Sequence, residues 1–157
     1  MKKTVKIIIG ISFIFYLLAL IVVLFIDSRG TGYGMPFLAY LRFSVNIIPF
    51  KTIGTYIMAI FDGSMNLNIP IRNLGGNFIL FLPMGVYLPI LIKKLDSFKS
   101  YSISMIPLLL SVELIQLITR RGSFDIDDII LNMFGALVGF IAWKSKFVQN
   151  LLNKYEY

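Results

Sequence analysis

The sequence predicts an all-α polytopic membrane protein in which a single domain, residues 1–157, crosses the bilayer four times. Composition is the first observation, since 57% of the residues are hydrophobic and only 15% charged. Soluble domains are about 45–50% apolar and about a quarter charged. The second is that four apolar runs approach the length of a membrane helix, at about residues 7–26, 74–92, 100–119 and 126–143. We therefore expect lipid to surround most of the chain.

The first predicted span, residues 7–26, contains no charged residue. A helix of this length is about 30 Å long, enough to cross the hydrocarbon core. Lys2, Lys3 and Lys6 precede it, as in a secretory signal peptide. Signal peptides, however, have an apolar stretch of about 7–15 residues and a cleavage site of small residues. This run is longer and is followed by Asp27, Ser28 and Arg29, so we interpret it as a retained membrane helix.

The connection between the first two spans, residues 27–73, is too long and too apolar to be a simple loop. Apolar side chains recur in it at helical spacing, at Ile53, Tyr56, Ile57, Ile60 and Phe61. This stripe predicts a short amphipathic helix in the outer interface of the membrane. We expect the helix to end at residues 62–64, Asp-Gly-Ser.

The other three spans carry few interruptions. Residues 74–92 contain Pro83 and Gly85, and residues 100–119 are interrupted by Pro107, Glu113 and Gln116. In the fourth span the uninterrupted apolar part is only residues 129–143. It is short for a bilayer, so the preceding Asp127 and Asp128 should lie close to the membrane surface or just beneath it.

The distribution of Lys and Arg predicts that both termini lie in the cytoplasm. With that orientation the inner segments hold nine basic residues, Lys2, Lys3, Lys6, Lys93, Lys94, Lys99, Lys144, Lys146 and Lys154. The outer segments hold six, Arg29, Arg42, Lys51, Arg72, Arg120 and Arg121. Four of these lie in the long first loop, and basic residues in long loops have less influence on membrane orientation. All five Arg fall outside, where a planar guanidinium suits carboxylate or phosphate recognition.

The composition also excludes several kinds of chemistry. The chain has no Cys and no His, which removes thiol nucleophiles, zinc sites of the usual type and imidazole catalysts, and we expect no cofactor. Its net charge of +7 is distributed between apolar runs without a nucleic-acid motif, so membrane lipids are the expected partners rather than RNA or DNA. Carboxylates with amide oxygens could ligate a hard cation, but residues 125–128 lack the spacing of an EF-hand loop.

Ionisable residues at membrane depth are costly and are expected to be functional, with a partner. On an ideal helix Glu113, Gln116 and Arg120 lie within an arc of about 60 degrees. Arg120 is about two turns from Glu113, so we expect Glu113 to pair across the helix interface with Asn77 or Asn132.

The fourth span presents a second polar face, because Asp128, Asn132, Gly135 and Gly139 share an arc of about 60 degrees. The glycines would permit close helix contact. Asp125 is well placed as the N-cap of this span. For Asn77 alone, an ordinary interhelical hydrogen bond explains the residue equally well. For the whole set we predict a functional polar pocket, formed by Asn77, Glu113, Gln116, Arg120, Arg121, Asp125, Asp127, Asp128 and Asn132.

These residues resemble the VanZ-like family of bacterial membrane proteins, which is named for an association with resistance to the glycopeptide teicoplanin. The resemblance covers roughly residues 42–139. It is carried in order by Asn46–Phe50, Asn77, Phe81, Pro83, Gly85, Glu113, Gln116, Arg121, Asp125–Asp128, Asn132 and Gly135. It implies a multi-pass protein of the cell membrane and envelope, but it brings no assigned reaction, so no catalytic residue is carried over.

Three functions are compatible with the sequence. The first is a VanZ-like envelope factor that affects susceptibility to teicoplanin and binds an anionic lipid-linked or cell-wall ligand from the outer side. The second is a membrane enzyme acting on a lipid-linked or cell-wall precursor, with Glu113 or an Asp as general acid or base. The third is a small transporter or accessory subunit, although the sequence has no recognisable inverted repeat.

Overall fold

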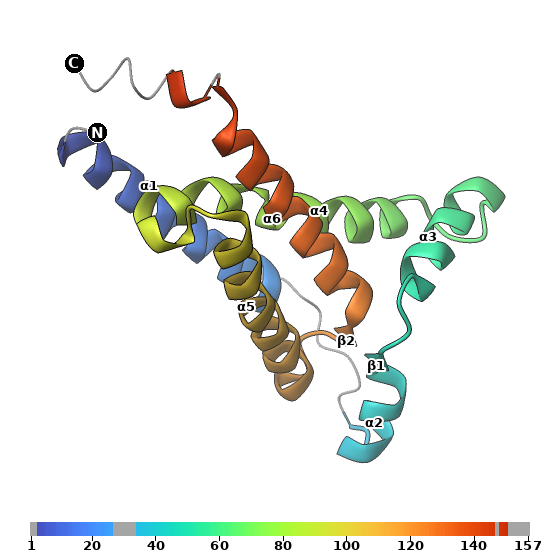
Figure 1. The fold of residues 1–157 in the computed structure, drawn as a ribbon. Helices are drawn as coiled ribbons and strands as arrows, with labels where there is room; N and C mark the ends of the chain where they lie inside the picture. The colour runs from blue at the N-terminus through green and yellow to red at the C-terminus, as the bar shows by residue number, and fades with distance from the viewer. Residues whose placement is uncertain (1–2, 27–33, 147, 151–157) are drawn as a thin grey trace.

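The computed structural model describes residues 3–26, 34–146 and 148–150. Within them, four helices are long and apolar enough to cross a membrane, which confirms the predicted all-α polytopic class. They are α1 (Lys3–Ile21), which continues as the π-helical turn η1 (Val22–Ile26), α4 (Asn68–Leu91), α5 (Phe98–Thr119) and α6 (Ile126–Lys144) (Figure 1). A 3-10 turn, η2 (Lys93–Leu95), joins α4 to α5.

The long connection after α1 folds into more structure than the sequence predicted. It contains α2 (Phe37–Ser44), β1 (Val45–Asn46) and α3 (Lys51–Asp62), and α4 begins at Asn68 within what we had assigned to the loop. The predicted amphipathic helix is α3, which ends at Asp62 with Gly63 in the left-handed conformation (φ 69°). Its apolar side chains Ile57 and Phe61 remain 44% and 86% exposed, as expected of a helix in contact with lipid.

A two-residue parallel pairing joins this outer region to the fourth span. β1 lies beside β2 (Phe124–Asp125), with Val45 opposite Phe124 and Asn46 opposite Asp125. Residues that are 79 positions apart in the chain are thereby held at the start of α6. The pairing fixes where α3 begins relative to α6, and so positions the candidate site.

The helices α4 and α6 cross at very short range, and glycines make this possible. A Cβ atom on Gly135 would lie 1.9 Å from the carbonyl oxygen of Phe78, and one on Gly139 would lie 2.0 Å from that of Leu82. On the opposite helix, a Cβ atom on Gly85 would lie 2.1 Å from the carbonyl oxygen of Ala136. The predicted close-packing face of α6 is therefore confirmed, and α4 is the helix against which it packs.

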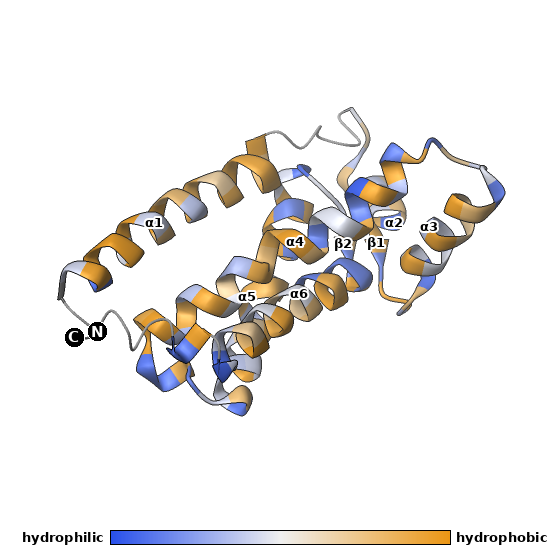
Figure 2. Ribbon diagram, turned by 90° about the horizontal axis from the view of Figure 1, so that it is seen from above, coloured by the Kyte–Doolittle hydropathy of each residue, from blue (hydrophilic) through white to orange (hydrophobic). Residues whose placement is uncertain are grey.

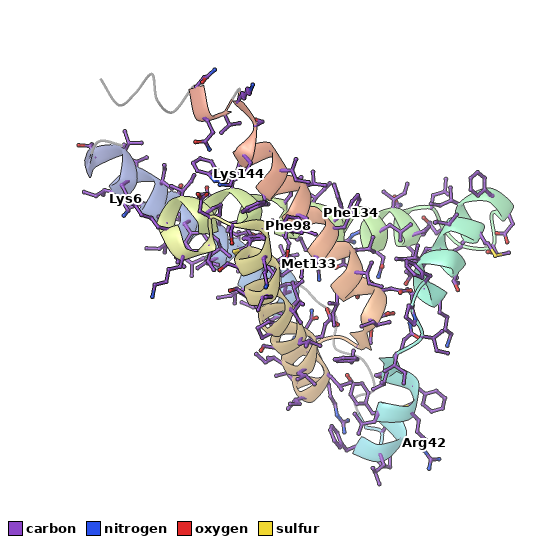
Figure 3. The ribbon with its side chains drawn as sticks, in the orientation of Figure 1. Lys6, Arg42, Phe98, Met133, Phe134 and Lys144 are labelled. Atoms are coloured by element: carbon purple, nitrogen blue, oxygen red, sulfur yellow. The ribbon has the colours of Figure 1, made fainter. Side chains whose placement is uncertain are left out.

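The two ends of the molecule differ in their basic residues. The start of α1, the α4–α5 turn and the end of α6 lie at one end, whereas α2 and α3 lie at the other (Figures 1 and 2). Figure 3 shows Lys6 and Lys144 at the first end and Arg42 at the second. An ion pair of 2.6 Å between Lys144 Nζ and Asp96 Oδ1 ties α6 to the turn before α5. We refer to these as the lysine end and the arginine end.

Candidate functional site

Asp127 lies in the first turn of α6 and is fully buried, with 0% of its surface exposed. One carboxylate oxygen accepts from the backbone amide of Phe50 at 2.5 Å, and the other from those of Thr52 at 2.7 Å and Ile53 at 3.1 Å. These amides lie at the start of α3. Backbone amides at a helix N-terminus have no acceptor within their own helix. The negative charge also complements the positive end of the α3 dipole. Asp127 therefore anchors α3 to α6.

Asp125 completes this anchor. Its Oδ1 accepts from the side chain of Asn46 at 2.9 Å and from the backbone amide of Asp127 at 2.9 Å. Its Oδ2 accepts from the hydroxyl of Thr52 at 2.6 Å. The predicted role of Asp125 as N-cap of the fourth span is thus confirmed. These contacts give both Asp125 and Asp127 a structural explanation that does not require a ligand.

A cavity of about 460 Å³ lies beside the anchor, where η1, α3, α4, α5 and α6 meet. The first half of α4 contributes most of its polar wall, through Asn68, Arg72, Asn73 and Asn77. A volume of this size falls within the range of about 300–1,000 Å³ that is usual for small-molecule sites. The cavity is the candidate functional site, because it brings side chains from five helices to one opening.

Three further polar residues reach the cavity from the other helices, namely Tyr56 on α3, Gln116 on α5 and Asp128 on α6. Asp128 Oδ1 accepts from Asn77 Nδ2 at 2.6 Å, which joins α6 to α4. Gln116 Nε2 donates to the carbonyl oxygen of Leu24 at 3.0 Å, within the π-helical turn of α1. Burial, with the charges of Asp128 and Asp125, raises the pKa of the Tyr56 hydroxyl, which keeps it protonated as a hydrogen-bond donor.

The cavity contains only part of the residue set that the sequence predicted. Asn77, Gln116 and Asp128 line it, whereas Glu113 and Asn132 do not, although they are only 2% and 1% exposed. Glu113 has a partner, as expected, but not the expected amide. Its Oε2 accepts from the backbone amide of Asp125 at 3.3 Å, while Asn77 binds Asp128 instead.

Arg120 and Arg121 lie at the end of α5. Arg120 follows the last helical residue with a left-handed backbone (φ 56°), so it does not continue the helix face of Glu113 and Gln116 as predicted. Its guanidinium donates to the carbonyl oxygen of Met35 at 3.0 Å and lies over the rings of Phe37 and Tyr40. It thereby holds α2 against the end of α5. The Arg121 backbone amide donates to the carbonyl oxygen of Gln116 at 2.9 Å.

Sequence reasoning missed four residues of the cavity, namely Tyr56, Asn68, Arg72 and Asn73. The last three were assigned to a loop, and Tyr56 to the apolar stripe of α3. Polar residues at positions 68, 72, 73 and 77 do recur at helical spacing, which could have shown that α4 begins before residue 74. In the part of the chain that the structure describes, no three acidic side chains are grouped as metal ligands would be.

Two comparisons with known proteins match the chain. The family description VanZ/LLP1 matches residues 13–149 of the chain. The protein VanZ of Enterococcus faecium is 28% identical over 100 residues, which make up 64% of this chain and 52% of that protein. The chain thus spans about half the length of this curated relative. No solved structure matches the chain.

Proposed function

Because the chain belongs to the VanZ/LLP1 family, we propose that it is an envelope protein that lowers susceptibility to teicoplanin. In this proposal the cavity binds an anionic lipid-linked or cell-wall ligand from the outer side of the membrane. Both termini lie in the cytoplasm, so the arginine end and the cavity face outward. The greater number of Lys residues in the segments assigned to the inside supports this orientation.

The observation that carries the proposal is the polar lining of the cavity at the arginine end. Arg72 supplies a guanidinium that suits phosphate or carboxylate groups, and the amides of Asn68 and Asn77 can bind further polar groups. Asp128 contributes an acceptor from α6. Such a site fits a small charged head group better than it fits a whole glycopeptide, so the ligand is a component of the envelope rather than the antibiotic itself.

The test is overexpression in a susceptible bacterium, with minimal inhibitory concentrations measured for teicoplanin and vancomycin. Wild-type protein should raise the minimal inhibitory concentration of teicoplanin more than that of vancomycin, because teicoplanin carries an acyl chain and meets the membrane. Arg72→Gln and Asp128→Asn should abolish the effect. The matched controls Arg42→Gln and Asp62→Asn change exposed residues outside the cavity and should retain it. Unchanged susceptibility to both antibiotics with wild-type protein present in the membrane would refute the proposal.

A membrane enzyme acting on a lipid-linked precursor is the second candidate, and one observation favours it. Asp128 lies on the cavity wall, and only its Oδ1 has a hydrogen-bond partner among the described residues. In an enzyme Asp128 would be the general acid or base, because Glu113 is enclosed away from the cavity. Turnover of a lipid-linked precursor by purified protein, lost in Asp128→Asn, would favour the enzyme over a binding protein.

A further inference from the structure

We propose that the cavity binds the head group of a phospholipid-like amphiphile that enters sideways from the outer half of the bilayer. Its phosphate lies at Arg72, and an adjacent donor group, an ammonium or a hydroxyl, lies at Asp128 and Asn73. This inference rests on the proposed function, since it names the chemical class of ligand for the same cavity.

The phosphate position follows from Arg72, the basic residue of the cavity wall. In the described part of the chain, its guanidinium makes no hydrogen bond or ion pair with another residue. A guanidinium presents five N–H donors in a fixed plane, which matches the oxygens of a phosphate. Arg72 is exposed, so this guanidinium is accessible to an anionic group of the ligand.

The donor group follows from two acceptors that line the cavity, Asp128 on α6 and Asn73 on α4. Asp128 Oδ1 is bound by Asn77, whereas Oδ2 has no partner among the described residues. The Oδ1 atom of Asn73 is enclosed from solvent and also has no partner in the structure. Leaving a buried acceptor such as Asn73 Oδ1 unpaired is costly, whereas Asp128 is only partly buried. A ligand that carries only a phosphate would not satisfy Asn73, so the ligand should also bring an N–H or O–H donor.

The apolar part of the cavity indicates a lipid rather than a soluble phosphate. Val23 and Leu24 of η1 and Ile69 and Leu80 of α4 line it. Val23 and Ile69 are 44% and 52% exposed, so apolar surface continues from the cavity to the outside of the bundle. Acyl chains can lie along this surface while the head group occupies the cavity. Short π-helical segments such as η1 occur frequently at functional sites, and Gln116 fixes this one through the Leu24 carbonyl.

The inference can be tested with the full-length chain purified in a non-ionic detergent. Native mass spectrometry would measure the apparent Kd of phosphatidylethanolamine and of phosphatidylcholine with identical acyl chains. These probes share the phosphate but differ in the donor, because three methyl groups replace the N–H groups in phosphatidylcholine. We expect phosphatidylethanolamine to bind about tenfold more tightly. Soluble glycerophosphoethanolamine, which has the same head group without acyl chains, should bind at least about a hundredfold more weakly than the lipid.

The variants separate the two halves of the site. Arg72→Gln should weaken binding of both lipids by about tenfold or more, while Arg72→Lys, which keeps the charge but loses the planar donor group, should recover only part of the affinity. Asp128→Asn should remove the preference for phosphatidylethanolamine. Arg42→Gln, which changes an exposed Arg outside the cavity, should bind like wild type. A melting temperature for each variant would distinguish lost binding from lost folding.

Three results would overturn the inference: equal affinity for the two lipids, unchanged binding in a folded Arg72→Gln variant, or equally tight binding of glycerophosphoethanolamine. The result is also separable from the antibiotic phenotype. Selective lipid binding without any change in teicoplanin susceptibility would refute the proposed resistance function and leave this inference standing. Reduced teicoplanin susceptibility without lipid selectivity would refute this inference and leave the proposed resistance function standing.

Discussion

Replacing Asp127 by Asn should destabilise the protein by releasing the start of α3 from α6. The carboxylate accepts three backbone N–H groups, those of Phe50, Thr52 and Ile53, and is completely buried. Asn has almost the same shape, so the substitution changes hydrogen bonding and charge with little effect on packing. It turns one of the two acceptor oxygens into an amino group that faces N–H donors.

The size of the effect follows from these contacts. At least one backbone N–H loses its acceptor, which costs about 1–3 kcal/mol in a buried position. Loss of the negative charge at the N-terminus of α3 adds about 0.3–1 kcal/mol. The total of about 1.3–4 kcal/mol is a large share of a typical folding free energy of about 5–15 kcal/mol. For a chain of this length, each kcal/mol corresponds to about 2–4 °C in melting temperature.

The assay is thermal unfolding of the purified protein in detergent, combined with limited trypsin digestion. Asp127→Asn should lower the melting temperature by several degrees and accelerate cleavage after Lys51, the first residue of α3. The neighbouring substitution Asp128→Asn is the matched control. Its carboxylate accepts one hydrogen bond from Asn77, which the new amide oxygen can still accept, so it should change stability less. If both variants melt like the wild type, Asp127 does not anchor α3 and the reasoning fails.

Three other predictions test packing, topology and surface charge. Gly135→Ala should cost about 1–3 kcal/mol or prevent folding, because its Cβ would lie 1.9 Å from the Phe78 carbonyl oxygen. Gly76→Ala, where nothing lies within 4 Å of the new Cβ, should be tolerated, and equal melting temperatures for the two variants would contradict the close crossing. An impermeant maleimide applied to cells should label Ser123→Cys but not Ser97→Cys, and the reverse pattern would invert the orientation. Lys144→Gln should cost less than about 1 kcal/mol in thermal unfolding, since its ion pair is partly exposed; a larger loss would mean that the pair matters more than its exposure suggests.

Much of the fold could be predicted from local patterns. Apolar runs identified the four membrane helices, and the spacing of Gly135 and Gly139 identified the face of α6 that packs closely. Asp125 was identifiable as an N-cap because it precedes an apolar run. The boundaries were less accurate where polar residues continue a helix, as at the start of α4, because hydropathy alone does not show that Asn68 and Arg72 are helical.

The partners of the buried acids could not be predicted in the same way. Glu113 was expected to bind a side-chain amide on another helix but accepts from the backbone amide of Asp125. Backbone amides are present at every position except proline, so the sequence does not indicate which of them will donate to a given carboxylate. The pairing of Asn46 with Asp125 joins segments 79 residues apart and has only two residues on each side, too few for a strand pattern.

Hydropathy and span length were enough to predict a membrane protein, because both are sums over neighbouring residues and need no knowledge of the fold. The amino-acid types alone also show which residues are too polar for lipid and must therefore find partners. How these residues divide between two roles depends on how the helices pack. Asp125 and Asp127 bind the start of α3, whereas Asp128, one residue further along the same helix turn, lines the cavity with Arg72. Adjacent residues on a helix point about 100 degrees apart, so each carboxylate meets a different neighbour, and that neighbour is set by how the helices cross.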